Sequence, residues 1–92
     1  MQEQQVERVV ARLRAGNVMA HVYSGGVYEF GVRVVLADGR EAIWDADGAA
    51  GLEATIMRDG QLVGMVPTID GSAGWDDDRV VAAIAEADYG EG

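Results

Sequence analysis

The sequence contains no cysteine, no lysine, a single proline and a single histidine among its 92 residues. The absence of cysteine excludes disulfide bonds, thiolate metal sites and thiol nucleophiles, so packing alone must hold the fold together. Long apolar runs are also missing, and the N-terminus lacks the basic and then apolar segments of a signal peptide. We therefore expect a cytoplasmic protein that neither crosses a membrane nor has one as a partner.

The lack of lysine leaves a strongly acidic chain. Seven arginines stand against 16 aspartates and glutamates, which gives a formal net charge of −9. Residues 70–92 hold seven of these acids and one arginine, so most of the negative charge lies near one end of the sequence. Such a chain repels phosphate backbones, whose binding needs several cationic contacts. We expect no direct binding to nucleic acid, and we expect any protein partner to offer a basic surface.

The first segment predicts an amphipathic helix. Val6, Val9, Val10 and Leu13 follow the spacing of one helix face, and Gly16 is the expected C-terminal cap. This helix should pack on the rest of the chain through its valine stripe.

From Asn17 to Pro67 the apolar period changes to two, which is typical of β-strands. Strands are expected near residues 17–25, 27–37, 53–58 and 61–67, with a further strand after Asp38-Gly39. The long second strand should place one face in the core, formed by Tyr28, Phe30, Val32, Val34 and Leu36.

Two Asp-Gly pairs, at residues 38–39 and 59–60, predict hairpins with two-residue type I′ turns. The first turn would pair Arg33 with Trp44, and so place Trp44 on the sheet face opposite the core. The second turn would give three cross-strand pairs, namely Met57 with Leu62, Ile56 with Val63 and Ala54 with Met65.

A second helix is predicted near the C-terminus. Asp76 is the expected N-cap, and Trp75 is expected to pack on Val80 as a hydrophobic staple. Tyr89 and Gly90 are expected to close the helix. Its buried stripe should consist of Val80, Ala83, Ile84 and Ala87.

The chain is therefore predicted to be one α+β domain, residues 1–92: an N-terminal helix, a five-stranded antiparallel meander built on two Asp-Gly hairpins, and a C-terminal helix, with both helices on one sheet face. The order of helix, strands and helix resembles the topology of the double-stranded RNA-binding domain. This chain has two strands more, and "DDD" at residues 76–78 stands where that family has a lysine cluster. The resemblance is thus one of topology and does not imply RNA binding.

No catalytic or metal site is expected. "DADG" at residues 45–48 resembles an ion-binding loop, but in the register of a calcium loop the two anchoring positions would be Ile43 and Ala54. Asp45 and Asp47 could form an acid and base pair, which makes a minimal hydrolase the least favoured alternative. His21 is expected to be a packing residue. We expect a non-enzymatic protein with no cofactor.

The remaining features favour a small acidic regulator or inhibitor that binds another protein, with a basic-surfaced, nucleic-acid-binding protein as its target. In charge and size the chain is similar to small phage-encoded inhibitors that occupy nucleic-acid-binding grooves, including anti-restriction and some anti-CRISPR proteins. The alternative is a homodimeric accessory or structural subunit that uses the free sheet face. Trp44 is either a binding anchor or is covered by the following loop or by Arg33. The candidate partner-binding residues are Trp44, Arg33, Asp77, Asp78, Glu86 and Asp88.

Overall fold

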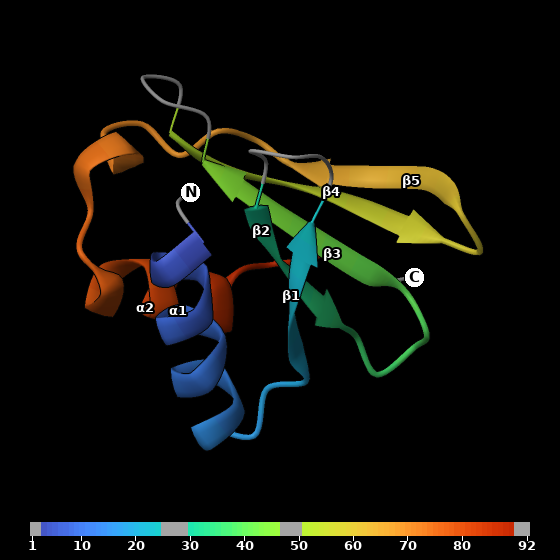
Figure 1. The fold of residues 1–92 in the computed structure, drawn as a ribbon. Coiled ribbons are helices and arrows are strands. Elements are labelled where there is room, and N and C mark those ends of the chain that lie inside the picture. Colours follow the sequence, from blue (N-terminus) through green and yellow to red (C-terminus); the bar gives the residue numbers. More distant parts are fainter. Residues whose placement is uncertain (1–2, 25–29, 47–50, 90–92) are drawn as a thin grey trace.

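The computed structural model describes residues 3–24, 30–46 and 51–89 (Figure 1). Five antiparallel strands form one sheet in the order β1-β2-β3-β4-β5, with a helix at each end of the chain and both helices in contact with the sheet. This architecture confirms the predicted α+β meander. The elements are α1 (Glu3–Ala15), β1 (Ala20–Ser24), β2 (Phe30–Val35), β3 (Glu41–Ala46), β4 (Leu52–Arg58), β5 (Gln61–Val66), the 3-10 helix η1 (Ser72–Gly74) and α2 (Asp77–Glu86).

Helix α1 buries the predicted stripe of valines and Leu13. Its end differs by one residue from the prediction, because Asn17 rather than Gly16 adopts the left-handed conformation, with a φ of 66°. The Val18 amide donates to the Leu13 carbonyl oxygen at 2.9 Å, and the Asn17 amide donates to the Arg14 carbonyl oxygen at 3.0 Å. This pair of bonds is a Schellman motif, which satisfies carbonyl groups at the helix end.

The β2–β3 hairpin corrects the predicted register. Leu36 and Arg40 close the loop, with the Leu36 amide donating to the Arg40 carbonyl oxygen at 2.8 Å, so the loop has three residues rather than two. Trp44 therefore pairs with Val32 instead of Arg33. A shift of one residue moves every side chain of a strand to the opposite face. The prediction that Trp44 lies opposite the core is wrong for this reason.

The β4–β5 hairpin follows the prediction at its turn. Asp59 and Gly60 have φ values of 52° and 80°, which fits a type I′ turn, and Met57 pairs with Leu62. Beyond that pair the register shifts between Ile56 and Met57, so Ile56 pairs with Gly64. The predicted pairs of Ile56 with Val63 and of Ala54 with Met65 are wrong because Val63 is an additional residue in β5.

Helix α2 begins as predicted. The Asp76 carboxylate accepts a hydrogen bond of 3.0 Å from the Arg79 amide, which is the geometry of an N-cap. Trp75 is half-buried and stacks under the Arg79 guanidinium, 4.9 Å from the ring centroid. The helix ends at Glu86, before Tyr89, and Gly90 lies outside the described residues.

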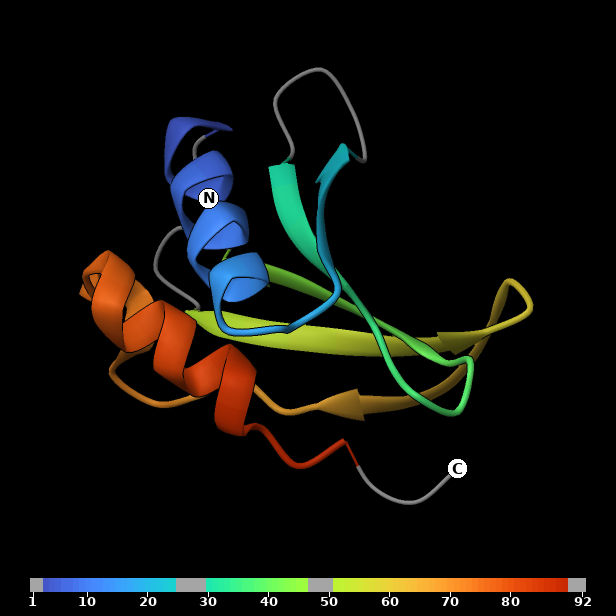
Figure 2. The same cartoon turned by 90° about the horizontal axis from the view of Figure 1, so that it is seen from below.

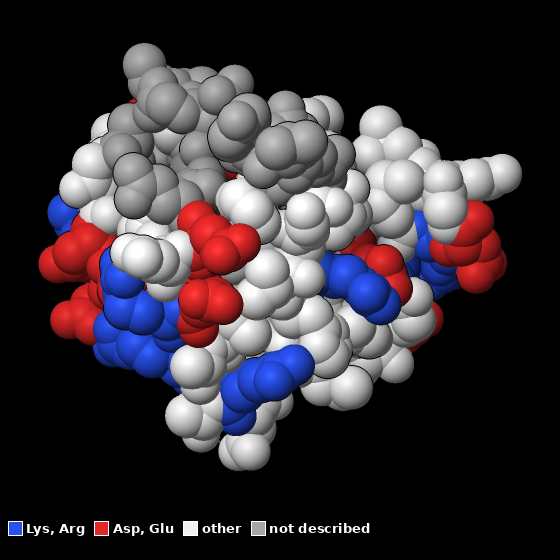
Figure 3. All heavy atoms as spheres, in the orientation of Figure 1, with Lys and Arg blue, Asp and Glu red and all other residues white. Residues whose placement is uncertain are grey.

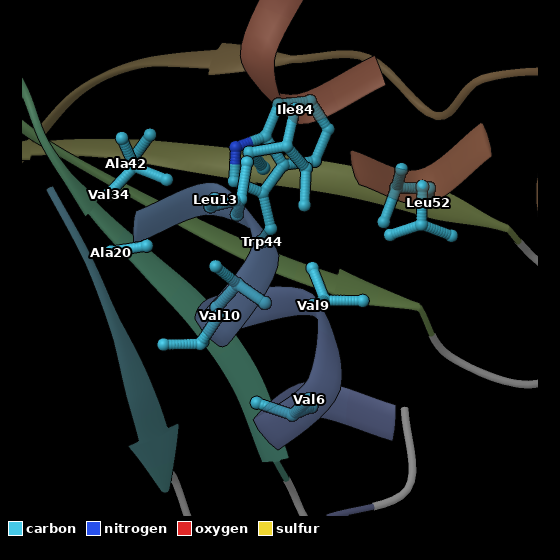
Figure 4. Packing of buried hydrophobic residues seen from close by; sticks show 13 residues of the cluster. Val6, Val9, Val10, Leu13, Ala20, Val34, Ala42, Trp44, Leu52 and Ile84 are labelled. Carbon is cyan, nitrogen blue, oxygen red and sulfur yellow. The ribbon is translucent and has the colours of Figure 1, made fainter. Parts of the chain in front are cut away.

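Both helices pack on the same sheet face, as predicted, and Trp44 lies at the centre of that core. Figure 4 shows Trp44 between Ile84 of α2 and Leu13 and Val10 of α1. Its side chain is 0% exposed. Phe30 and Leu36, predicted as core residues, are only partly buried, and Tyr28 lies outside the described residues. The sheet is strongly twisted, and the β4–β5 hairpin projects away from both helices (Figure 2).

Candidate functional site

The face of the sheet turned away from the helices forms the candidate site, called the free face below. Because strand residues alternate between faces, the residues between those of the core belong to it. Helices α1 and α2 pack on the other face, so these side chains are only partly buried. In the three central strands and at the end of β1 the free face consists of Tyr23, Arg33, Val35, Glu41, Ile43, Asp45, Glu53, Thr55 and Met57.

Two adjoining hollows form a groove on the free face. The first has a volume of about 300 Å³ and lies between Tyr23 and Phe30 at one end and Thr55 and Met57 at the other. The second, also of about 300 Å³, reaches the two Asp-Gly turns. Ile43 and Met57 line both hollows, so the two are continuous along the strands.

The described lining of this groove carries acids and no arginine. Asp45 and Glu53 line the first hollow, while Glu41 and Asp59 line the second. Asp45 and Glu53 are directly opposite each other in the β3–β4 pairing. Carboxylates at opposite positions of a sheet repel each other, so this pair concentrates negative charge in the first hollow.

Glu41 and Glu53 are each held in place by an intramolecular hydrogen bond. Glu41 accepts a hydrogen bond of 2.8 Å from Arg33, and Glu53 accepts one of 2.8 Å from the Thr68 hydroxyl. Arg33 thus belongs to the free face, as predicted, but as the partner of Glu41 and not as a neighbour of Trp44. The groove is an acidic and partly apolar surface.

The predicted acidic run at residues 76–78 is largely engaged within the molecule. Asp77 pairs with Arg8 at 2.7 Å, and Asp78 pairs with Arg12. The hydrogen bond from Arg8 lowers the pKa of Asp77 below its usual value. Arginine and carboxylate groups accordingly lie side by side over α1 and α2 in Figure 3. These two aspartates join the helices, and their charge is mostly compensated.

Of the remaining predicted residues, Glu86 and Asp88 are exposed at and after the end of α2, on the helix side of the molecule. Trp44 is enclosed in the core and does not reach any surface. The structure therefore does not bring the six predicted residues together. Sequence reasoning missed the pairing of Asp45 with Glu53, because the alternation of residues in β3 indicates only which side chains share a face.

His21 contacts α1 rather than a catalytic group. Its Nδ1 atom lies 2.9 Å from Nη2 of Arg14, within hydrogen-bond distance. No group of three or more potential metal ligands occurs within residues 3–24, 30–46 and 51–89. Asp47, considered above with Asp45, lies outside this part of the chain.

Neither helix of the described residues has the length and apolar character needed to cross a membrane. Comparison of the chain with models of protein families, with curated proteins and with solved structures gave no match.

Proposed function

We propose that this protein is a non-enzymatic binding protein whose groove on the free face holds a basic segment of another protein. The observation that carries the proposal is the pairing of Asp45 with Glu53 inside a hollow lined by Tyr23, Phe30 and Met57. Carboxylates beside aromatic and thioether groups suit a lysine or arginine side chain, whose alkyl stem packs on apolar surface while its charge meets the acids.

The shape of the groove supports an extended occupant. It follows the strands from Tyr23 to the turns at residues 39 and 60, and it offers acids in both hollows. A segment with two basic residues separated by apolar ones would match this arrangement. The net charge of −9 would add long-range attraction to a basic partner.

The expected regulator or inhibitor function is kept, but the binding surface is now the groove instead of Trp44 and the C-terminal acids. Because Asp77 and Asp78 are paired with arginines, the C-terminal acids contribute less local charge than the sequence suggests. A partner that itself binds nucleic acid would have the required basic surface, so an inhibitor of the kind encoded by phages remains the specific form of the proposal.

The test is affinity capture from the native host with three forms of the protein. The wild type should retain a partner that Asp45→Asn/Glu53→Gln loses. The matched control is Glu3→Gln/Glu7→Gln, which removes the same charge from exposed positions of α1 and should retain the partner. Equal capture of the partner by all three forms would refute the groove as the binding site. Equal loss of the partner from both double variants would show that binding depends on net charge alone and not on the groove.

A further inference from the structure

Several aspartates of the chain stand directly before a glycine. The described residues contain three such pairs, at residues 38–39, 59–60 and 70–71, and a fourth, at residues 47–48, lies outside them. An aspartate side chain can react with the amide nitrogen of the next residue, and glycine, which has no Cβ, hinders this reaction least. The contacts of the three described pairs differ, so their reactivity should differ as well.

The first pair is protected by its contacts. The Arg40 amide donates a hydrogen bond of 3.1 Å to Oδ1 of Asp38, and Nε of Arg40 donates one of 2.7 Å to Oδ2. The bond from the Arg40 amide lowers the pKa of Asp38, and an ionised carboxylate is attacked at its carbon less readily than a carboxylic acid. The Gly39 amide is itself bonded, since it donates to the Leu36 carbonyl oxygen at 3.1 Å. Both reacting groups of this pair are therefore held.

The pair at residues 70–71 lies in a turn that is fixed from both sides. The Ser72 amide donates to the Ile69 carbonyl oxygen at 3.2 Å, and the Ile69 amide donates to the Leu52 carbonyl oxygen at 2.9 Å. The buried Ser72 hydroxyl accepts a bond of 2.7 Å from the Leu52 amide. This turn is thus joined to the start of β4, and it cannot open without breaking these bonds.

The pair at residues 59–60 has none of these restraints. Within residues 3–24, 30–46 and 51–89, the exposed Asp59 carboxylate has no hydrogen-bond or ion-pair partner, and the Gly60 amide has no acceptor. Asp59 has a φ of 52°, which is unfavourable for a residue with a Cβ. A Cβ at Gly60 would meet nothing within 4 Å, and the hairpin projects away from both helices (Figure 2). Opening this turn disturbs little beyond the last strand pair, Arg58 with Gln61.

We propose that Asp59-Gly60 is a site of spontaneous isomerisation to isoaspartate. The Gly60 amide nitrogen attacks Cγ of Asp59, and the new C–N bond closes a five-membered imide while the carboxyl OH and the amide proton leave as water. Water then adds to one of the two ring carbonyls. Opening at the side-chain carbonyl restores aspartate, whereas opening at the main-chain carbonyl leaves the chain running through the former side chain. The mass is unchanged, and no oxidant or reductant takes part.

The modification would change the β4–β5 hairpin and the groove. Isoaspartate adds one carbon atom to the main chain between Arg58 and Gln61, and a two-residue turn of fixed geometry does not accommodate it. Asp59 also lines the second hollow, so its carboxylate would move relative to the groove. Any effect on partner binding rests on the proposed function. The isomerisation does not, and it is measured without a partner.

Peptide mapping of aged protein tests the proposal. The folded chain is kept at neutral pH and body temperature over weeks, and fragment mass spectra distinguish isoaspartate from aspartate at each pair. We expect isoaspartate to accumulate several-fold faster at residue 59 than at residues 38 and 70. The control is the same chain unfolded in guanidinium chloride, where the contacts are absent and the three pairs should react at similar rates. A folded chain in which residue 59 reacts no faster than residues 38 and 70 would overturn the proposal.

Asp59→Glu is the matched variant. It keeps the negative charge, but its imide would be a six-membered ring, which forms much more slowly. Leu62 reports on the turn, because it pairs with Met57 beside it. After ageing, the wild type should show a second amide NMR resonance for Leu62, and a folded Asp59→Glu chain should show one resonance. A second Leu62 resonance in both forms, or in neither, would contradict isomerisation at residue 59.

Discussion

Trp44 donates a hydrogen bond of 3.0 Å from its indole Nε1 atom to the hydroxyl of Tyr89, and the two rings meet edge to face with centroids 6.1 Å apart. The Tyr89 hydroxyl donates in turn to the Ile84 carbonyl oxygen at 2.7 Å. Arg40 adds a bond of 2.8 Å from Nη1 to the Tyr89 carbonyl oxygen. These contacts attach the chain after α2 to the centre of the sheet and leave Trp44 no part in the surface.

Replacing Tyr89 tests this attachment. Tyr89→Phe keeps the ring but removes the acceptor of the buried indole N–H, and an unsatisfied buried donor costs about 1 to 3 kcal/mol. Urea denaturation should show a loss of stability in this range. Tyr23→Phe, at a more exposed tyrosine on the edge strand, is the control and should change little. Similar stability of both variants and the wild type would show that the Trp44 bond contributes nothing.

The same tyrosine predicts an alkaline loss of stability. Burial raises the pKa of Tyr89 above its ordinary value of 10.0, although the bond from Trp44 acts against this shift. The folded chain thus holds the phenolic proton more tightly than the unfolded chain. The resulting stability is complete below pH 10 and is lost as the pH rises through the raised pKa. Denaturation midpoints measured across this range should fall for the wild type and fall less steeply for Tyr89→Phe.

The burial of Trp44 changes the expected effects of core substitutions. Trp44→Ala should cost about 3 to 5 kcal/mol, which is enough to abolish cooperative unfolding in a marginally stable domain of this size. Phe30→Ala should cost less, because Phe30 is only partly buried at the start of β2. Thermal melts of the two variants compare them directly. A larger loss of stability from Phe30→Ala than from Trp44→Ala would contradict the central position of Trp44 in the core.

Apolar periodicity predicted both helices, the number of strands and the face on which the helices pack. It could do so because the buried stripe of each helix and the alternation of each strand are properties of neighbouring residues. The loop length of the β2–β3 hairpin is different, since Asp38-Gly39 fits either a two-residue turn or the last part of a three-residue loop. The difference of one residue in loop length determines on which face of the sheet Trp44 lies.

The candidate site could be predicted only in part, because it depends on the register of β3 and on contacts between distant parts of the chain. In β3, Ala42 and Trp44 alternate with Glu41, Ile43 and Asp45, and this pattern already favoured an inward tryptophan. The engagement of Asp77 and Asp78 could not be read from the sequence, because Arg8 and Arg12 lie far away along the chain and meet them only when the helices pack together.

Substitutions in and just before the first turn of α2 distinguish the stability due to the N-cap from the stability due to the ion pair. Asp76→Ala should cost about 1 kcal/mol, because it removes the acceptor of the Arg79 amide. Asp77→Asn should cost less than Asp76→Ala, because it removes only an ion pair with the exposed Arg8 side chain. Since the pKa of Asp77 is lowered, the contribution of the pair is lost as the pH falls through that lowered value. Urea titrations at neutral and acid pH measure both effects, and an Asp77→Asn penalty that persists unchanged in acid would contradict the ion-pair explanation.

The most direct test of partner binding at the free face is methyl NMR of the chain with its captured partner. Ile43 and Met57 line both hollows of the groove, whereas Ile84 of α2 is buried in the core. The expected result is that the methyl resonances of Ile43 and Met57 shift or broaden when the partner is added, and that Asp45→Asn/Glu53→Gln abolishes the change. Changes confined to residues beside α1 and α2, with Ile43 and Met57 unaffected, would contradict the proposal that the groove is the binding site.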